Sequence, residues 1–173
     1  MEIEEIKALI RDVPDFPEPG IVFKDITPVL ADPMAFSTIT DTIVVHFGRG
    51  NVDKVVGIEA RGFILASPVA YHFNAGFVPI RKKGKLPWET VDEEYALEYG
   101  TATLEIHKDG VQSGERVLIV DDVLATGGTA AAAASLIEQI GGKVCGVACL
   151  IELDFLHGRE KVKDHELFTL IHY

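Results

Sequence analysis

The sequence predicts an α/β fold with a mostly parallel, twisted sheet flanked by helices. Two observations carry this prediction: short apolar runs typical of buried strands recur along the chain, and segments with helical spacing of apolar residues separate them. Strands that alternate with helices favour crossover connections, which make neighbouring strands parallel. Because ligands bind beyond the carboxyl ends of such strands, the residues that follow each strand are the first candidates for a functional site.

Each expected element has its own local pattern. Helical spacing appears at apolar positions 3, 6, 9 and 10 and again at 36, 39, 43 and 47. The later elements are expected in this order: a strand near 54–58, a helix near 63–73, strands near 77–81, 101–106 and 117–120, a helix over 130–140, and strands near 144–153 and 167–172. Residues 84–100 are polar and contain Gly and Pro, so we expect a long excursion from the core there.

Composition and charge narrow the class of protein. With 173 residues, of which 47% are hydrophobic, the chain is expected to form a single domain over residues 1–173. Its net charge of −11 argues against nucleic acid or an anionic membrane as a partner. The sequence has no run of about 18 apolar residues, and its acidic start is unlike a signal peptide, so we expect a cytoplasmic protein. Cys145 and Cys149 would lie about 13 Å apart on one strand, too far for a disulfide, and are expected to be packing residues.

The segment VLIVDDVLATGGTA, which starts at Val117, predicts an anion site. Its first four residues are typical of a buried strand, and Thr126 is placed to cap the helix that follows. Gly127 and Gly128 would let a ligand approach the backbone without a Cβ in the way. Backbone N–H groups and the positive end of the helix dipole would then hold a phosphate. The alternative for this loop is an ordinary strand-to-helix turn.

Two carboxylates make this anion site more specific. Asp121 and Asp122 directly precede the loop and would repel a polyphosphate unless a hydrogen-bond donor lay between them and the phosphate. A ribose supplies such donors, because its hydroxyls pair with carboxylates while its 5-phosphate reaches the loop. The segment therefore predicts a ribose 5-phosphate site.

The strand, the acidic pair and the ATGGT loop together resemble the signature of the type I phosphoribosyltransferases, which bind 5-phosphoribosyl 1-diphosphate (PRPP). Within that family the resemblance is to the members that act on adenine, and it extends along almost the whole chain. Further segments carry it: DFPEPGIVFKDITPVL at 15–30, GIEARGF at 57–63, RKKGKLP at 81–87 and LEYGTATLEI at 97–106.

The resemblance implies a fold and a reaction. The fold is the type I phosphoribosyltransferase fold with a flexible hood loop at about 84–100. The reaction is transfer of the 5-phosphoribosyl group from PRPP to N9 of adenine, giving AMP and pyrophosphate in purine salvage. The residues implied to bind PRPP and AMP are Asp121, Asp122, Ala125, Thr126, Gly127, Gly128 and Thr129.

A second candidate site follows the strand that ends near Ile58. An anion-binding guanidinium would be well placed at Arg61, although a surface salt bridge is the alternative from this residue alone. The basic run at 81–85 is the one dense positive patch of an acidic sequence, and without a ligand it would be solvated surface. The resemblance implies that these groups bind pyrophosphate and that Arg61 also takes part in catalysis. In the family, the turn that matches GIEARGF commonly has a non-proline cis peptide. The implied set is Glu59, Ala60, Arg61, Arg81, Lys82 and Lys85.

The resemblance also implies which residues bind the base and which residue transfers its proton. Glu98 matches the family glutamate that manages the proton of the attacking base, and Tyr99 would help the hood loop to seal the site. From the residues alone, these two are an exposed pair in a loop. Phe23 and Val123 would stack on the two faces of adenine, with the backbone of Lys24 reading its edge. The family more often has Leu at the position of Val123, and Phe23 by itself could equally be a core residue.

The implied cofactor is Mg²⁺ bound with PRPP rather than held in a protein cage, so no metal ligands are assigned. The implied partners are the small molecules adenine and PRPP, in a homodimer. Two alternatives stay open: a phosphoribosyltransferase for another purine base, and a PRPP-binding regulatory protein without catalysis. The six histidines have no ligand-like spacing and receive no role.

Overall fold

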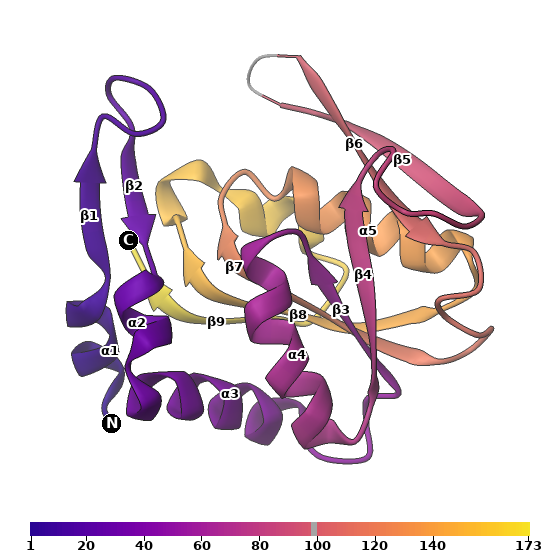
Figure 1. Cartoon of the computed structure of the whole chain (residues 1–173), viewed down its shortest axis with the longest axis horizontal. Coiled ribbons are helices and arrows are strands. Elements are labelled where there is room, and N and C mark those ends of the chain that lie inside the picture. Colours follow the sequence, from indigo (N-terminus) through magenta and orange to yellow (C-terminus); the bar gives the residue numbers. More distant parts are fainter. Residues whose placement is uncertain (98–99) are drawn as a thin grey trace. The chain divides into compact units, whose positions relative to one another are not determined.

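The structure is a computed structural model that describes residues 1–97 and 100–173 (Figure 1). The chain divides into two compact units, Met1–Thr42 and Ile43–Tyr173. The single domain expected over residues 1–173 stays a prediction.

The first unit contains short helices and a hairpin. Its elements are α1 (Ile3–Leu9), β1 (Arg11–Pro14), β2 (Val22–Asp25), α2 (Thr27–Ala31) and the start of α3 (Pro33–Phe47). The helical spacing at both early segments is confirmed by α1 and α3. At the start of α1, the carboxylate of Glu5 accepts a hydrogen bond from the N–H of Glu2 at 2.9 Å. Sequence analysis predicts no strand here, because β1 and β2 are only four residues long, and neither the largely exposed β1 nor the mostly half-buried β2 has an apolar alternation.

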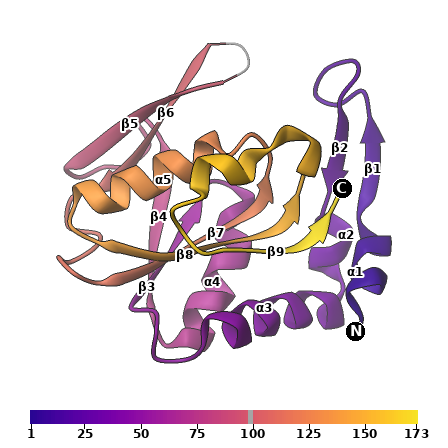
Figure 2. The same ribbon diagram turned by 180° about the vertical axis from the view of Figure 1, so that it is seen from behind.

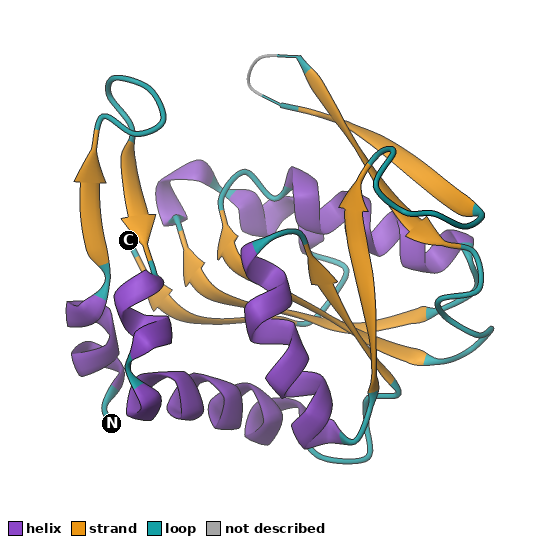
Figure 3. Cartoon of the chain, in the orientation of Figure 1, coloured by secondary structure: helices purple, strands orange, loops and turns teal. Residues whose placement is uncertain are grey.

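The second unit is built on a seven-stranded sheet (Figure 3). Its strands are β3 (Lys54–Ile58), β4 (Gly76–Lys82), β5 (Thr90–Ala96), β6 (Thr101–His107), β7 (Arg116–Leu124), β8 (Lys143–Glu152) and β9 (Leu167–His172). Their order across the sheet is β5-β6-β4-β3-β7-β8-β9. The run from β4 to β9 is parallel, whereas β6 pairs antiparallel with both β4 and β5. A mostly parallel sheet with helices confirms the predicted fold class.

Helices cover both faces of this sheet. The two views in Figures 1 and 2 show α4 (Arg61–Phe73) on one face and α5 (Gly128–Gln139) on the other. Packing of α4 is against β3, β4 and β7, and packing of α5 is against β5 to β8. Between β8 and β9 the chain forms two short 3-10 helices, η1 (Asp154–Leu156) and η2 (Gly158–Val162). Within the described residues, no helix has the length and apolar content needed to cross a membrane.

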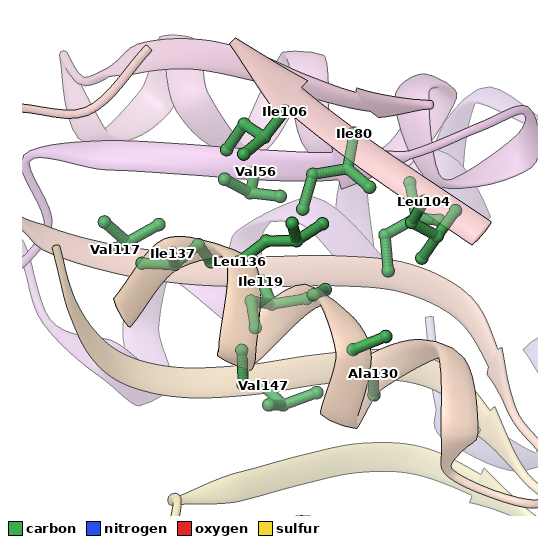
Figure 4. Packing of buried hydrophobic residues seen from close by; sticks show 14 of the residues in the cluster. Val56, Ile80, Leu104, Ile106, Val117, Ile119, Ala130, Leu136, Ile137 and Val147 are labelled. Atoms are coloured by element: carbon green, nitrogen blue, oxygen red, sulfur yellow. The ribbon is translucent and has the colours of Figure 1, made fainter. Parts of the chain in front are cut away.

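The apolar core of the second unit lies between α5 and the sheet (Figure 4). Its members come from neighbouring strands and from the inner face of α5, and they include Val56, Ile80, Leu104, Ile106, Val117, Ile119, Leu136, Ile137 and Val147. Both cysteines are free, as expected, and Cys149 is fully buried on β8. This core fixes the strand ends that carry the candidate site.

Three elements, β5, β7 and α5, differ from the sequence-based expectation. The expected excursion at 84–100 contains β5, which pairs with β6 along its whole length. The acidic composition of TVDEEYA is untypical of a strand, so β5 was not predicted. Pairing and packing decide strand formation here more than propensity does. β7 continues past 120 because it stays paired with β8 as far as Leu124. The helix expected over 130–140 begins earlier, at Gly128.

Candidate functional site

Two adjacent parallel strands bring the predicted PRPP-binding residues together. β3 pairs with β7, so the turn after Ile58 lies beside the acidic end of β7. There the Nε of Arg61 donates a hydrogen bond to Oδ2 of Asp122. The Asp122 side chain is 7% exposed and that of Arg61 is 44% exposed. The structure therefore joins the predicted pyrophosphate-binding and ribose-binding residues in one place.

Gly62 allows this approach, and sequence analysis gave it no role. A Cβ at this position would lie 2.7 Å from Oδ1 of Asp121 and 3.1 Å from the carbonyl oxygen of Val120. Only a residue without a side chain lets the first turn of α4 pack so closely on β7. The glycine directly after Arg61 in GIEARGF was the signal that could have identified it.

The acidic pair is held in an environment that disfavours two negative charges. Burial raises the pKa of Asp121 well above its ordinary value, and the neighbouring charge of Asp122 raises it further. The N–H of Asp122 donates to Oδ1 of Asp121 at 2.9 Å. A ligand that offers hydroxyl donors here would satisfy the carboxylate oxygens at the point where burial makes their charge costly.

The loop after β7 has the geometry of an anion site. A cavity of about 60 Å³ is lined by the carboxyl end of β7, the loop, the start of α5 and one residue of β8: Asp121, Val123, Leu124, Ala125, Thr126, Gly127, Thr129, Ala130 and Cys149. The predicted cap at Thr126 is wrong. Gly127 is the residue that precedes α5, it has a left-handed φ of 77°, and none of the described side chains caps the helix. A backbone turn rather than a hydroxyl therefore begins α5, which leaves its first N–H groups for a ligand.

The two glycines of the loop have a second reason to be glycine. A Cβ on Gly127 would lie 2.2 Å from the carbonyl oxygen of Gly158, and one on Gly128 would lie 3.1 Å from the ring of Tyr95. The hydroxyl of Thr129 also donates to the Tyr95 hydroxyl at 3.2 Å. The loop is thus packed between β5 and the segment after β8, which sequence analysis did not foresee.

The basic run is organised around a buried carboxylate. Lys85 Nζ lies 2.8 Å from Oε2 of Glu59, Arg81 Nη2 lies 3.6 Å from the same oxygen, and the N–H of Lys82 donates to Oε1. Burial by itself would raise the pKa of Glu59, but the hydrogen bonds from Lys85 and Lys82 outweigh it and lower that pKa. Ionised Glu59 therefore holds the cations in position, and the peptide between Glu59 and Ala60 is cis.

Glu105 also orders this region, and sequence analysis missed it. Its side chain sits on β6, the residue is 4% exposed, and Oε1 accepts the N–H groups of Lys85 at 3.0 Å and Leu86 at 2.8 Å. Arg81 Nε is buried and has no hydrogen-bond partner among the described residues. A buried donor without a partner is costly, so a polar ligand would be favoured beside Arg81.

The predicted adenine-binding residues lie in both units. Phe23 and Lys24 are on β2 of the first unit, where Phe23 makes an edge-to-face contact with Phe16 and Lys24 Nζ lies 2.6 Å from Oδ1 of Asp12. Val123 is half-buried on β7 of the second unit. The sandwich of Phe23 and Val123 around adenine stays a prediction. Glu98 and Tyr99 lie outside the residues that the structure describes.

Among the described residues, one group of side chains is spaced to hold a metal ion. The ligand atoms of Glu152, Asp154 and His172 lie within 4.8 Å of one another. The carboxylate oxygens of Glu152 already accept two hydrogen bonds from Arg159. The expectation that the protein has no dedicated metal cage stays a prediction.

A mostly parallel sheet that presents an acidic pair and a glycine-containing loop at one strand end defines a class, the enzymes that bind a phosphorylated ribose there. The family model of the phosphoribosyl transferase domain matches residues 27–172, and the chain belongs to this family.

The relatives narrow the family further. The chain is 62% identical over 159 residues to adenine phosphoribosyltransferase of Acidothermus cellulolyticus, which covers 92% of this chain and 90% of that protein. A solved structure of adenine phosphoribosyltransferase from Thermoanaerobacter pseudethanolicus has a TM-score of 0.96 and 52% identity, covering 99% of this chain and 100% of that one. The Saccharomyces cerevisiae enzyme, complexed with an imino-altritol bisphosphate and adenine, has a TM-score of 0.92 and 40% identity, with 97% of each chain covered.

Proposed function

We propose that this protein transfers the 5-phosphoribosyl group of PRPP to N9 of adenine, producing AMP and pyrophosphate. The observation that carries the proposal is the pairing of Asp121 and Asp122 with the loop at Gly127 and Gly128, on a fold shared with adenine phosphoribosyltransferases. Adenine as the base is supported by the high identity to relatives of that name and by the adenine bound in the yeast structure.

The chemistry follows from where the charges lie. Carboxylates of Asp121 and Asp122 would accept hydrogen bonds from the ribose hydroxyls, while N–H groups at the start of α5 hold the 5-phosphate. The bond from C1 of the ribose to N9 of adenine forms as the bond from C1 to the pyrophosphate oxygen breaks. Pyrophosphate takes the electron pair of that bond, so the cations that meet it must stabilise growing negative charge.

Arg61 and the basic run would provide this stabilisation. The geometry supports the role, because Glu59 and Glu105 hold Arg81 and Lys85 in fixed positions before any ligand arrives. Preorganised charges cost little reorganisation at the moment of reaction. The Nε of Arg81, which has no hydrogen-bond partner in the part of the chain that the structure describes, gives a further reason for an anion to bind there.

The base and its proton are assigned to residues that match the family motif. We propose that Phe23 and Val123 stack on adenine, that the backbone of Lys24 pairs with its edge, and that the Glu98 carboxylate takes the proton from the attacking base. Tyr99 would close the hood loop beside Glu98. Exclusion of water at this step protects the activated ribose from hydrolysis.

Mg²⁺ is proposed as a cofactor that arrives with PRPP. Carboxylate oxygens are the hard donors that Mg²⁺ prefers, and half-buried Asp121 lies beside the buried carboxylate of Asp122, where a positive charge is favourable. Asp121 and Asp122 could therefore hold the ion together with ligand oxygens. When bound, Mg²⁺ would neutralise charge on the diphosphate.

A homodimer is the proposed quaternary state. Apolar side chains are exposed along one face of α4 and on the neighbouring β4, with Ile64 44%, Tyr71 82% and Phe77 38% exposed. A second copy would remove this surface from water. Light scattering on the purified protein tests it, and a monomeric mass at micromolar concentration would contradict it.

The two competing functions are separated by one assay. Purified protein is incubated with PRPP, Mg²⁺ and each of adenine, hypoxanthine, guanine and xanthine in turn, and pyrophosphate release is measured. We expect release with adenine and little with the others. Turnover of another base in place of adenine would favour a different purine phosphoribosyltransferase, and PRPP binding without turnover would favour a regulatory protein.

A further inference from the structure

The segment between β8 and β9 packs directly against the predicted phosphate loop. A Cβ on Gly158 would lie 2.2 Å from the carbonyl oxygen of Ala125 and 2.8 Å from the nitrogen of Gly127. In the opposite direction, a Cβ on Gly127 would lie 2.2 Å from the carbonyl oxygen of Gly158. The two backbones can meet this closely only because both positions lack a side chain.

An ion pair between the half-exposed guanidinium of Arg159 and the buried carboxylate of Glu152 fixes the residue next to Gly158. Arg159 donates from Nε and Nη2 to the two carboxylate oxygens of Glu152, at 3.0 and 2.6 Å. The side chain of Glu152 is 4% exposed, and Oε2 also accepts from the Thr169 hydroxyl at 2.8 Å. A two-pronged guanidinium–carboxylate contact fixes orientation as well as distance, so Arg159 holds the backbone of η2 in one position.

The ends of the segment are anchored independently of this pair. The N–H of Leu153 donates to the carbonyl of Leu124 at 3.0 Å, and the N–H of Asp154 to the carbonyl of Tyr173 at 2.9 Å. At the other end, Val162 is 1% exposed and belongs to the same core cluster as the residues of α5. Removal of the ion pair should therefore loosen the middle of the segment without unfolding it.

The same side chains could be taken for a cation site, because Glu152, Asp154 and His172 cluster together. Arg159 places its positive charge on both oxygens of Glu152 and so satisfies the most buried of these groups. These side chains therefore form a structural ion pair. Gly158, the neighbour of Arg159, is the residue that contacts the phosphate loop, so the ion pair can affect the position of that loop through the backbone.

We propose that residues 152–162 are a brace for the phosphate loop, in which Glu152 and Arg159 are positioning residues that hold Gly158 against Ala125 and Gly127. The inference rests on the proposed function, since the ligand of the loop is taken to be the 5-phosphate of PRPP or AMP. The brace keeps the N–H groups of the loop at the spacing that a phosphate requires. Small displacements of such groups are enough to weaken binding and catalysis strongly.

The test uses the full chain in phosphate-free buffer, with two independent ways of disturbing the brace. Arg159→Gln removes the ion pair, and Gly158→Ala introduces a Cβ against the loop while leaving the ion pair intact. Lys163→Gln is the matched control, because it removes the same charge from an exposed position in the same connection. Arg159→Lys keeps the charge but not the two-pronged contact, so it should restore binding only in part.

Three measurements are made on each variant. Hydrogen exchange of the amides at 124–128 reports the order of the loop whether or not the protein is an enzyme. Calorimetric titration with ribose 5-phosphate measures binding at the loop. Steady-state kinetics separates the effect on the KM for PRPP from the effect on kcat. We expect faster exchange in the loop and roughly ten- to a hundredfold weaker ribose 5-phosphate binding in Arg159→Gln and Gly158→Ala, with a larger change in KM than in kcat. Lys163→Gln should match the wild type.

Unchanged loop exchange in both Arg159→Gln and Gly158→Ala would overturn the brace, whatever their activity. Faster exchange with unchanged ribose 5-phosphate affinity would overturn its role in phosphate binding. A wild-type protein that bound no ribose 5-phosphate would instead contradict the proposed function, and the exchange data would still decide whether the brace orders the loop.

Discussion

Arg61 donates a hydrogen bond from Nε to Oδ2 of Asp122, and this contact joins the first turn of α4 to the acidic end of β7. Both partners belong to the predicted PRPP site, one on the pyrophosphate side and one on the ribose side. In the free protein each therefore neutralises the other, and PRPP would supply a replacement for both: hydroxyl donors for the carboxylate and phosphate oxygens for the guanidinium.

This contact predicts that Arg61 and Asp122 act as a unit in the free protein. Effects of Arg61→Ala and Asp122→Asn on the free energy of unfolding should not add, with a coupling of at least about 0.5 kcal/mol. Urea denaturation of the two single variants and the double variant measures it. Strict additivity would show that the pair contributes nothing to the stability of the free protein.

The acidic pair should determine PRPP affinity. Combined replacement of Asp121 and Asp122 by Asn is expected to weaken PRPP binding severely, because each hydrogen bond between an ionised group and a hydroxyl contributes roughly 1.5–3 kcal/mol. Calorimetric titration with PRPP is the measurement, and Asp109→Asn, at an exposed position on another loop, is the matched control. Wild-type affinity in the double variant would place the ribose elsewhere.

Glu98 should affect turnover rather than binding. Glu98→Gln is expected to lower kcat by about 10²- to 10⁴-fold, the usual range for a lost acid–base group, with little change in PRPP affinity. Steady-state kinetics with adenine, together with PRPP titration, separates the two effects. Near-normal kcat would make Glu98 an ordinary loop residue and would favour the regulatory alternative.

Adenine should be strongly preferred to hypoxanthine. Backbone groups at Lys24 would pair with the amino group and N1 of adenine, and hypoxanthine presents the opposite donor and acceptor pattern. A buried site with mismatched polar partners can reject an analogue by roughly 10⁴-fold or more. The measurement is kcat/KM for each base at saturating PRPP, and hypoxanthine or guanine within tenfold of adenine would contradict the assignment.

Two variants separate the backbone of Lys24 from the side chains around it. Lys24→Ala should keep the preference, because its Nζ is engaged with Asp12 of the neighbouring strand and the proposed reading groups are main chain. Phe23→Ala should instead weaken binding of every base through lost stacking. Loss of the preference in Lys24→Ala would show that the side chain reads the base.

Acid should weaken the contribution of Glu152 to stability. Burial by itself would raise the pKa of Glu152, but hydrogen bonds from Arg159 and Thr169 outweigh it and lower that pKa below the ordinary value of 4.5. A lowered folded-state pKa means that the ionised group stabilises the fold above the unfolded-state pKa, and that this contribution is lost as pH falls through the folded-state value. The stability gap between wild type and Glu152→Gln in urea denaturation should therefore be largest near pH 7 and shrink below pH 4.5. A gap independent of pH would show that the charge of Glu152 is not what stabilises the segment.

The sequence by itself determined the fold class, the helices α3, α4 and α5, and the parallel strands. Strands that are buried on both faces have continuous apolar runs, and helices have apolar residues at helical spacing. It also located Asp121, Asp122 and the glycine loop, since residues that follow a buried strand in this class lie at a ligand-binding edge. β1, β2 and β5 were not predictable, because very short or acidic strands depend on pairing partners rather than on their own pattern.

Only the tertiary structure decided which residues meet. Gly62 against Asp121, Glu105 at Lys85, and Gly158 against Gly127 are contacts between residues far apart in the chain, and a local pattern such as GIEARGF can mark a glycine without naming its partner. The beginning of α5 at Gly128, without a Thr126 cap, is likewise decided by the packing of Gly127 against another backbone. Local sequence specifies elements and candidate chemistry, whereas close packing at the strand ends determines how the site is held.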